Sequence, residues 1–254
     1  MNSDLTLKTS LYMTSEQDKK KKTAVVFGAT GLIGKELVKA LLSDGSYEKV
    51  TVVVRSPLVL PDSKLSQIKL TDFSKLSELK EKLKSGSWFC CLGTTIKTAG
   101  SREAFAKVDL EMPKAIARLA EAASAESLVV ISSIGANASS SNFYLRTKGE
   151  MEKSVREIYK GNLKFVRPSL LMGDRVEFRL AESISAIFMK AIGWMMIGPM
   201  RRYQGIKAGD LARAMIIISD GPVGDRNSCP RKTQSRSRGI CRVVVAILKS
   251  GRHL

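Results

Sequence analysis

The chain has little histidine and no paired-cysteine motif. Its one histidine, His253, lies at the extreme C-terminus, so neither a histidine-based metal site nor a Ser-His triad is expected, and we expect no bound metal. Cys90 and Cys91 are adjacent in an apolar run, so we expect one on each face of a buried strand. The four cysteines show no CxxC spacing and no disulfide framework, which favours a reducing compartment (Cys90, Cys91, Cys229, Cys241).

The chain also lacks a secretory signal and an uninterrupted hydrophobic run. Residues 1–22 are polar and contain no apolar segment of the kind that signal peptides carry. The most apolar stretch, residues 184–200, is interrupted by Lys190 and by Gly198-Pro199, so we do not expect it to span a membrane. We instead expect residues 175–205 to cover a substrate. We predict a cytoplasmic protein, with the nucleus or the surface of an organelle membrane as alternatives.

Basic residues are in excess and unevenly placed. The 254 residues carry a formal net charge of +18, with a compact run at residues 19–22 and a strongly basic segment at residues 221–254. Such clusters occur in nuclear import signals and at nucleic-acid or acidic membrane surfaces. No aromatic residues alternate with these basic ones, so nucleic acid is an unlikely partner and a solvated tail is the simpler interpretation.

Short apolar runs alternate with helical patterns along most of the chain. We predict strands at residues 23–27, 49–54, 65–70, 87–92, 128–131 and 163–166, with helices after residue 32 and at 102–123 and 144–159. We expect Pro113 to kink or divide the second helix. This alternation predicts an α/β fold with a doubly wound parallel sheet, the Rossmann architecture, and a small C-terminal part that covers the substrate.

The predicted domain organisation has three parts. Residues 1–22 form a flexible leader, residues 23–218 form the domain, and residues 219–254 form a basic tail that is disordered or atypical. In a doubly wound sheet, ligands lie across the carboxyl ends of the strands. We therefore expect the residues that follow the six strands to converge on one crevice (Gly28, Arg55, Asp72, Gly93, Ser133, Pro168).

A glycine-rich turn follows the first predicted strand. In Gly28-Ala-Thr-Gly31-Leu-Ile-Gly34, the small residues let the backbone approach a pyrophosphate. The free N–H groups at the start of the following helix then hold the anion. The position of this motif between a strand and a helix predicts a dinucleotide site.

The end of the second predicted strand indicates which dinucleotide binds. Sites that prefer NAD usually place a carboxylate there, which accepts a hydrogen bond from the ribose 2′-hydroxyl. This chain has Arg55 instead, and a guanidinium can bind a 2′-phosphate in a bidentate manner. We predict NADP(H), with NAD(H) the less favoured cofactor; otherwise Arg55 simply ends the strand in solvent.

Tyr144 and Lys148 stand four residues apart, so they share one helix face. An unperturbed phenol has a pKa of about 10, and a nearby ammonium lowers it toward the range of a useful acid or base. The pair Ser132-Ser133 ends a predicted strand just upstream and can position a substrate oxygen. This combination predicts proton transfer to or from a carbonyl or hydroxyl group.

The chain resembles the short-chain dehydrogenase/reductase superfamily and, more closely, its atypical Tat-interacting-protein-like branch. The resemblance covers about residues 23–218, and its motifs are Cys90-Cys-Leu-Gly93-Thr-Thr, Ser141-Asn-Phe-Tyr144-Leu-Arg-Thr-Lys148-Gly-Glu150 and Arg167-Pro-Ser-Leu-Leu-Met-Gly-Asp174-Arg175, followed by Arg179. It implies Ser133 as the catalytic serine, with Ser132 in reserve, beside Tyr144 and Lys148. It also implies the following NADP(H) contacts: Gly28, Thr30, Gly31, Leu32, Ile33, Gly34, Arg55, Asp72, Leu92, Gly93, Tyr144, Lys148, Leu171 and Arg179.

Two functions are compatible with these features. The first is an NADP(H)-dependent oxidoreductase that acts on a small, apolar carbonyl or alcohol through Ser133, Tyr144 and Lys148. The second is an NADP(H)-binding, redox-sensing regulatory protein that acts through protein partners with little or no turnover, as the resemblance also allows. The intact Ser-Tyr-Lys set favours the first, whereas the basic termini favour the second.

Overall fold

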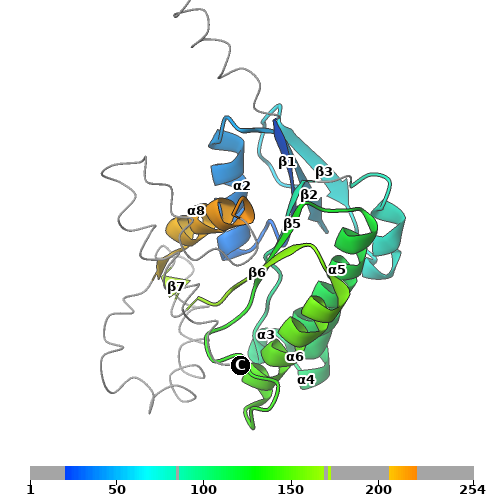
Figure 1. Ribbon diagram of the computed structural model, residues 1–254, viewed down its shortest axis with the longest axis vertical. Helices are drawn as coiled ribbons and strands as arrows, with labels where there is room; N and C mark the ends of the chain where they lie inside the picture. Colours follow the sequence, from blue (N-terminus) through cyan, green and yellow to red (C-terminus); the bar gives the residue numbers. More distant parts are fainter. Residues whose placement is uncertain (1–20, 84–85, 169–170, 173–205, 222–254) are drawn as a thin grey trace, which may run out of the picture.

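The computed structural model describes residues 21–83, 86–168, 171–172 and 206–221. Its centre is a six-stranded, all-parallel sheet in the order β3-β2-β1-β4-β5-β6 (Figure 1). The strands are β1 (Lys22–Phe27), β2 (Tyr47–Val54), β3 (Leu65–Lys69), β4 (Ser87–Cys90), β5 (Ser127–Ile131) and β6 (Asn162–Val166). The chain runs outward from β1 to β3 and then crosses to β4, so the strand order reverses between β1 and β4. This order confirms the doubly wound Rossmann fold.

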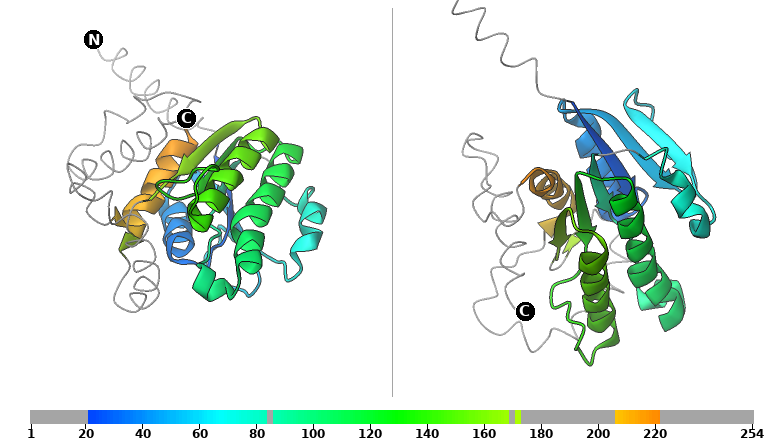
Figure 2. Two further views of the ribbon diagram at one scale, coloured as in Figure 1. Left: turned by 90° about the horizontal axis from the view of Figure 1, so that it is seen from below. Right: turned by 45° about the vertical axis from the view of Figure 1, so that its right-hand side comes forward.

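Helices cover both faces of the sheet (Figure 2). One face carries α2 (Leu32–Ser43) and α8 (Ala208–Ser219), which contact each other extensively. The other face carries the 3₁₀ helix η1 (Phe73–Leu79), α5 (Met112–Ala122) and α6 (Phe143–Ile158). Each face has its own buried hydrophobic cluster, because alternate side chains of every strand point to opposite sides.

The burial of two segments at the centre of the sheet can be compared with their sequences. Residues 50–54 of β2 are all valine or threonine and all buried, which is typical of a parallel strand covered on both faces. Cys90 belongs to the cluster under α5 and α6, whereas Cys91 packs against the cluster under α2 and α8. The two cysteines therefore point to opposite faces, as predicted.

The helix predicted at residues 102–123 is divided. It follows the short helix α3 (Ile96–Ala99) and consists of α4 (Arg102–Ala106), the π-helical segment η2 (Lys107–Glu111) and α5. Pro113 has no N–H to donate to the carbonyl of Asp109, and the Met112 N–H bonds five residues back to Lys107. The predicted effect of Pro113 is thus confirmed as a local widening of the helix immediately before α5.

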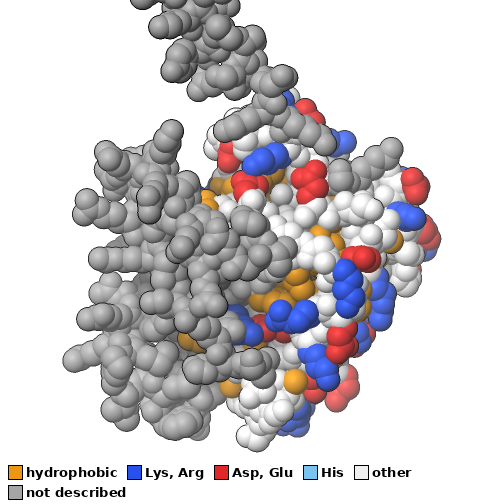
Figure 3. Space-filling model, in the orientation of Figure 1, with side chains coloured by type: hydrophobic (Ala, Val, Ile, Leu, Met, Phe, Trp, Pro, Cys, Tyr) orange, Lys and Arg blue, Asp and Glu red, His pale blue; other side chains and the backbone are white. Residues whose placement is uncertain are grey.

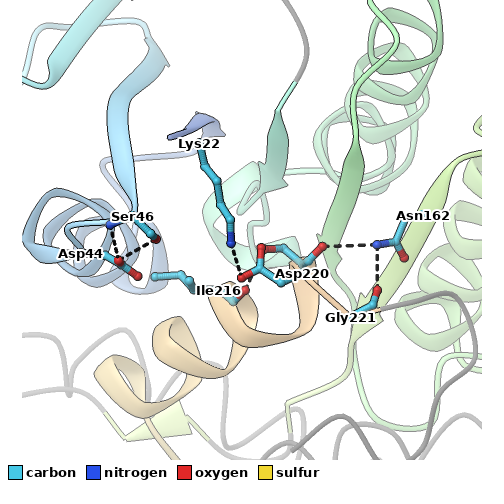
Figure 4. Close-up of polar contacts among 8 residues, drawn as sticks. Lys22, Asp44, Ser46, Asn162, Ile216, Asp220 and Gly221 are labelled. Atoms are coloured by element: carbon cyan, nitrogen blue, oxygen red, sulfur yellow. Dashed lines mark hydrogen bonds and ion pairs between the residues drawn. The ribbon is translucent and has the colours of Figure 1, made fainter. Parts of the chain in front are cut away.

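The C-terminal end of α8 is attached to the amino ends of two strands (Figure 4). The side-chain amide of Asn162 donates hydrogen bonds to the carbonyl oxygens of Ser219 (3.2 Å) and Gly221 (3.0 Å). Lys22 forms an ion pair with Asp220, with 2.7 Å between Nζ and Oδ2. These contacts hold the C-terminal end of α8 at the edge of the sheet where the strands begin, opposite to the edge where they end.

Two short strands, β7 (Leu171–Met172) and β8 (Ile206–Lys207), pair with each other in parallel, and β8 leads directly into α8. Within the described ranges, no helix has the length and apolarity needed to cross a bilayer. Lys22, which we assigned to the leader, is the first residue of β1. Residues 1–20 of the leader, the expected substrate cover and most of the tail lie outside the described residues, so those expectations stay predictions.

Candidate active site

The carboxyl ends of the strands place most of the predicted site residues at one edge of the sheet. Phe27 is the register partner of both Val53 and Cys90, so β1, β2 and β4 end at the same level. The Ser132 N–H bonds to the carbonyl of Val166 (2.7 Å), which joins the end of β5 to the end of β6. The segments that follow these strands therefore meet at this edge.

The glycine turn is built without room for side chains. Gly28 has a φ of +79°, and a Cβ atom on it would lie 2.7 Å from the carbonyl carbon of Cys91. A Cβ on Gly34 would lie 2.0 Å from the carbonyl oxygen of Gly28. The N–H of Gly31 bonds to that same oxygen (3.1 Å). The turn thus brings the start of α2 into close contact with β1 and with the segment after β4.

The start of α2 is open to an anion. No side chain caps Gly31, and the first turn of α2 has no acidic residue. Thr30 and Gly31 are exposed, whereas the Ile33 side chain is buried in the core, so Ile33 can offer a ligand only its backbone. An uncapped helix start with a positive dipole end and no acidic residue in its first turn fits a pyrophosphate.

Arg55 and Asp72 follow β2 and β3 and are both exposed. Among the described residues, Arg55 has no carboxylate partner, so its guanidinium is available to a ligand. Asp72 caps η1: one carboxylate oxygen accepts hydrogen bonds from the Ser74 N–H (3.0 Å) and hydroxyl (2.7 Å). These bonds, the Ser74 hydroxyl first, lower the pKa of Asp72. Asp72 therefore has a local structural role whether or not it also contacts an adenine.

The segment after β4 lies beside the glycine turn. Leu92 packs against the cluster on the α5 and α6 side, and Gly93 is exposed. A Cβ on Gly93 would lie 3.6 Å from a carboxylate oxygen of Asp109, which is ordinary contact distance. Leu171 is placed in β7 by its backbone, and Arg179 lies outside the described residues.

Tyr144 and Lys148 lie in the first turns of α6. Asn142 caps this helix by accepting a hydrogen bond from the Leu145 N–H (3.2 Å). Tyr144 is half-buried, with its ring centroid 5.5 Å from that of Phe105 in α4. The Lys148 side chain is only 4% exposed. Both residues lie in α6 one turn apart, so they share one helix face as the spacing predicted.

Asp109 is a member of this cluster that our sequence analysis missed. Its Oδ1 lies 2.7 Å from Nζ of Lys148, and the side chain is 1% exposed. Its Oδ2 accepts a hydrogen bond from the Thr94 N–H (2.8 Å). Burial by itself lowers the pKa of Lys148, but the charges of Asp109 and Tyr144 outweigh it, so the pKa is raised.

The position of Asp109 in the sequence contained a clue. Phe105, Pro113 and Ile116 are buried on the inner side of this helical region. Asp109 falls between them at the same spacing, where an apolar residue would be expected. A carboxylate on a buried helix face needs a cationic partner, and this requirement could have identified it.

Both serines are buried, but their hydroxyl groups differ. The Ser133 hydroxyl donates a hydrogen bond to the carbonyl of Ile134 (3.2 Å). The Ser132 hydroxyl has no hydrogen-bond partner among the described residues. Each hydroxyl lies at the end of β5, and neither is firmly held by another side chain.

The loop between β5 and α6, residues 132–142, follows β5 with the two serines and packs directly on α6. A Cβ on Gly149 would lie 2.1 Å from the backbone nitrogen of Ala138, and the Asn137 N–H bonds to the carbonyl of Leu145 (3.1 Å). Farther along α6, the buried Glu152 accepts a hydrogen bond from Nε of Arg167 (2.8 Å) and pairs with its terminal nitrogen. The loop, α6 and the end of β6 are thereby joined.

A family profile described as NAD(P)H-binding matches residues 28–179, more than half of the chain. Protein HTATIP2 of Rattus norvegicus is 34% identical over 174 residues, covering 67% of this chain and 72% of the relative. The chain is therefore an atypical short-chain dehydrogenase/reductase of the HTATIP2 branch. Protein FMP52, mitochondrial, of Debaryomyces hansenii is 34% identical over 205 residues, covering 79% of this chain and 89% of that protein.

Solved structures support the fold of this atypical dehydrogenase/reductase. A short chain dehydrogenase family protein from Francisella tularensis has a TM-score of 0.59 at 14% identity, covering 82% of this chain and 93% of that one. The Bordetella bronchiseptica enzyme WbmH, solved in complex with NAD+, has a TM-score of 0.60 at 14% identity, covering 80% and 73%. In the part of the chain that the structure describes, no three metal-binding side chains gather.

Proposed function

We propose that this protein is an NADP(H)-dependent oxidoreductase that acts on a small carbonyl or alcohol. The observation that carries the proposal is the buried Lys148 ammonium beside Tyr144, at the sheet edge that also holds the uncapped glycine turn. One part of this edge suits a dinucleotide and the other suits proton transfer. The bound nicotinamide would supply or accept the hydride.

The protein residues would handle the proton and the substrate oxygen. During reduction, the Tyr144 hydroxyl donates a proton to the carbonyl oxygen as the carbonyl carbon gains a hydride. The positive charge of Lys148 stabilises the phenolate that is left behind. The hydroxyl of Ser133, or that of Ser132 in its place, donates a hydrogen bond that orients the substrate oxygen.

The choice of NADP(H) over NAD(H) rests on Arg55. It follows β2, is exposed, and within the described residues faces no carboxylate that would occupy its guanidinium. A 2′-phosphate carries up to two negative charges, and a planar guanidinium can bind two of its oxygens. The remaining contacts would come from the glycine turn, Leu92, Gly93, Leu171 and Arg179.

The decisive experiment is to follow the nicotinamide absorbance of NADPH in the presence of purified protein and a panel of apolar aldehydes, ketones and quinones. We expect oxidation of NADPH with at least one member of the panel, and none with Tyr144→Phe. Binding of NADPH without any turnover would instead favour the regulatory protein that acts through partners. Failure to bind either nicotinamide cofactor would refute both proposals.

The buried thiol of Cys90 does not favour a redox sensor that works through this cysteine. Cys90 lies beneath the site, and desolvation by burial raises its pKa to about 11, so it stays a protonated thiol at neutral pH. For its location, we propose the cytoplasm or the surface of an organelle, and the mitochondrial FMP52 relatives favour an organelle. Imaging of the tagged chain against mitochondrial and cytosolic markers tests this.

A further inference from the structure

Asp109 connects two parts of the candidate site. One oxygen binds the Thr94 N–H in the segment after β4, and the other contacts the Lys148 ammonium of α6. The carboxylate and the ammonium are almost completely buried, with side-chain exposures of 1% and 4%. Two buried charges at 2.7 Å depend on each other, because each would otherwise face an environment of low polarity.

Few groups compensate the charge of Lys148. The titratable groups that face it are Tyr144 on its own helix, Cys90 in β4 and Asp109 in η2. Cys90 is neutral at physiological pH, and Tyr144 gains a charge only when it has lost its proton. Among the described residues, Asp109 is therefore the one carboxylate that faces Lys148. A lysine buried without such a partner tends to lose its proton.

We propose that Asp109 is the positioning residue of this site, which keeps Lys148 as an ammonium ion and aims it from the segment after β4 toward Tyr144 and the cofactor ribose. The part that concerns the cofactor rests on the proposed function. The charge state of Lys148 does not, so the two parts can be tested separately. The residue acts through Lys148 and contacts neither substrate nor cofactor.

The first test measures stability in urea between pH 7 and pH 9.5 without cofactor. In Asp109→Asn, the folded protein holds the Lys148 proton less firmly than the unfolded chain does, so the free energy of unfolding rises with pH. The matched control is the double variant Asp109→Asn/Lys148→Met, which lacks the titrating group. We expect the unfolding constants of the two variants to diverge by at least about tenfold over this range. Parallel curves would overturn the proposal.

The second test measures NADPH affinity over the same pH range, in which the 2′-phosphate is fully ionised because its second pKa is about 6. We expect the wild type to bind almost equally well throughout. Asp109→Asn should lose at least about tenfold in affinity by pH 9.5 and converge on the double variant. Asp109→Glu, which keeps the carboxylate, should restore the flat profile. A flat profile for Asp109→Asn would overturn the role toward the cofactor.

Other outcomes are equally informative. If the wild type does not bind NADPH, the proposed function fails while the stability test still decides the charge of Lys148. If Asp109→Asn folds only at pH 9.5, the proposal is supported in its strongest form. If Asp109→Asn and the double variant both fail to fold at every pH, Asp109 acts through Thr94 and the fold, and the proposal is wrong.

Discussion

A methyl group on Gly34 would meet the carbonyl oxygen of Gly28 at 2.0 Å. Both partners are constrained, because Gly34 belongs to α2 and the Gly28 oxygen already accepts the Gly31 N–H. The contact cannot be relieved by moving a flexible side chain. It fixes the distance between the first turn of α2 and the end of β1, where the pyrophosphate is expected.

Gly34→Ala should therefore push α2 away from the turn. We expect the free energy of unfolding to fall by about 1–3 kcal/mol, as at other overpacked sites. We also expect a marked loss of NADPH affinity, because the shift occurs at the proposed pyrophosphate site. Gly45→Ala is the control, since a Cβ there meets nothing within 4 Å. Urea unfolding and calorimetric titration measure the two effects. Normal NADPH binding by Gly34→Ala would show that the cofactor does not use this turn.

Arg55→Asp should reverse the cofactor preference. The wild type should bind NADPH more tightly than NADH, and the variant should bind NADH more tightly, because a carboxylate repels a 2′-phosphate and accepts the 2′-hydroxyl. Lys49→Asp is the control: it makes the same change of charge on an exposed residue of β2, the strand that Arg55 follows. Equal affinities of the wild type for both cofactors would place Arg55 in solvent.

Tyr144→Phe should abolish turnover while NADPH affinity stays nearly unchanged, because the variant loses the proton donor and keeps the ring beside Phe105. Tyr159→Phe is the matched control. Its hydroxyl donates to the buried carbonyl of Ala125 (2.7 Å), so its loss should cost about 1–3 kcal/mol of stability and leave turnover intact. The test is to compare the steady-state rates of the two variants and the wild type on the substrate found in the panel. Full activity of Tyr144→Phe would refute the acid/base assignment.

Ser133→Ala should lower kcat by roughly 10²-fold, the usual effect of removing one donor to a developing negative charge. Ser132→Ala should change kcat little, and its stability should not fall, because the Ser132 hydroxyl has no partner to lose among the described residues. If the rates show the reverse, the catalytic hydroxyl belongs to Ser132. If neither variant is slower, both serines serve the fold alone.

Asn162→Ala should destabilise the protein more than Lys22→Met. The first variant leaves the carbonyl oxygens of Ser219 and Gly221 without their donor, at a cost of about 1–3 kcal/mol. The second removes an ion pair whose side chains are 36% and 42% exposed, worth about 0–1 kcal/mol and weaker in salt. Urea unfolding at low and high salt compares them. Equal losses would mean that α8 is held mainly by its apolar face.

The sequence was sufficient to predict the sheet, because strand patterns and glycine turns are local. The five residues 50–54 and the Gly28–Gly34 turn each carry their structural information within a few positions. The spacing of Tyr144 and Lys148 predicted their shared helix face for the same reason. The direction of Cys90 and Cys91 followed from the two-residue period of a strand.

Contacts between distant segments could not be predicted in this way. Asp109 and Lys148 are far apart in the chain, and only the packing of η2 against α6 brings their charges together. The attachment of α8 through Asn162 likewise joins residues separated by more than fifty positions. The local sequence around either residue of such a pair does not identify its partner.

The contact between Gly149 and the backbone at Asn137 and Ala138 has a consequence for substrate selection. It packs the loop that follows Ser132 and Ser133 directly on the helix that carries Tyr144 and Lys148, so there is no room to shift one against the other at this point. Substrates of different size then cannot be accommodated by separating the serine from the tyrosine. In the proposed enzyme, a change of substrate size would instead have to be accommodated by the segments that follow β4 and β6.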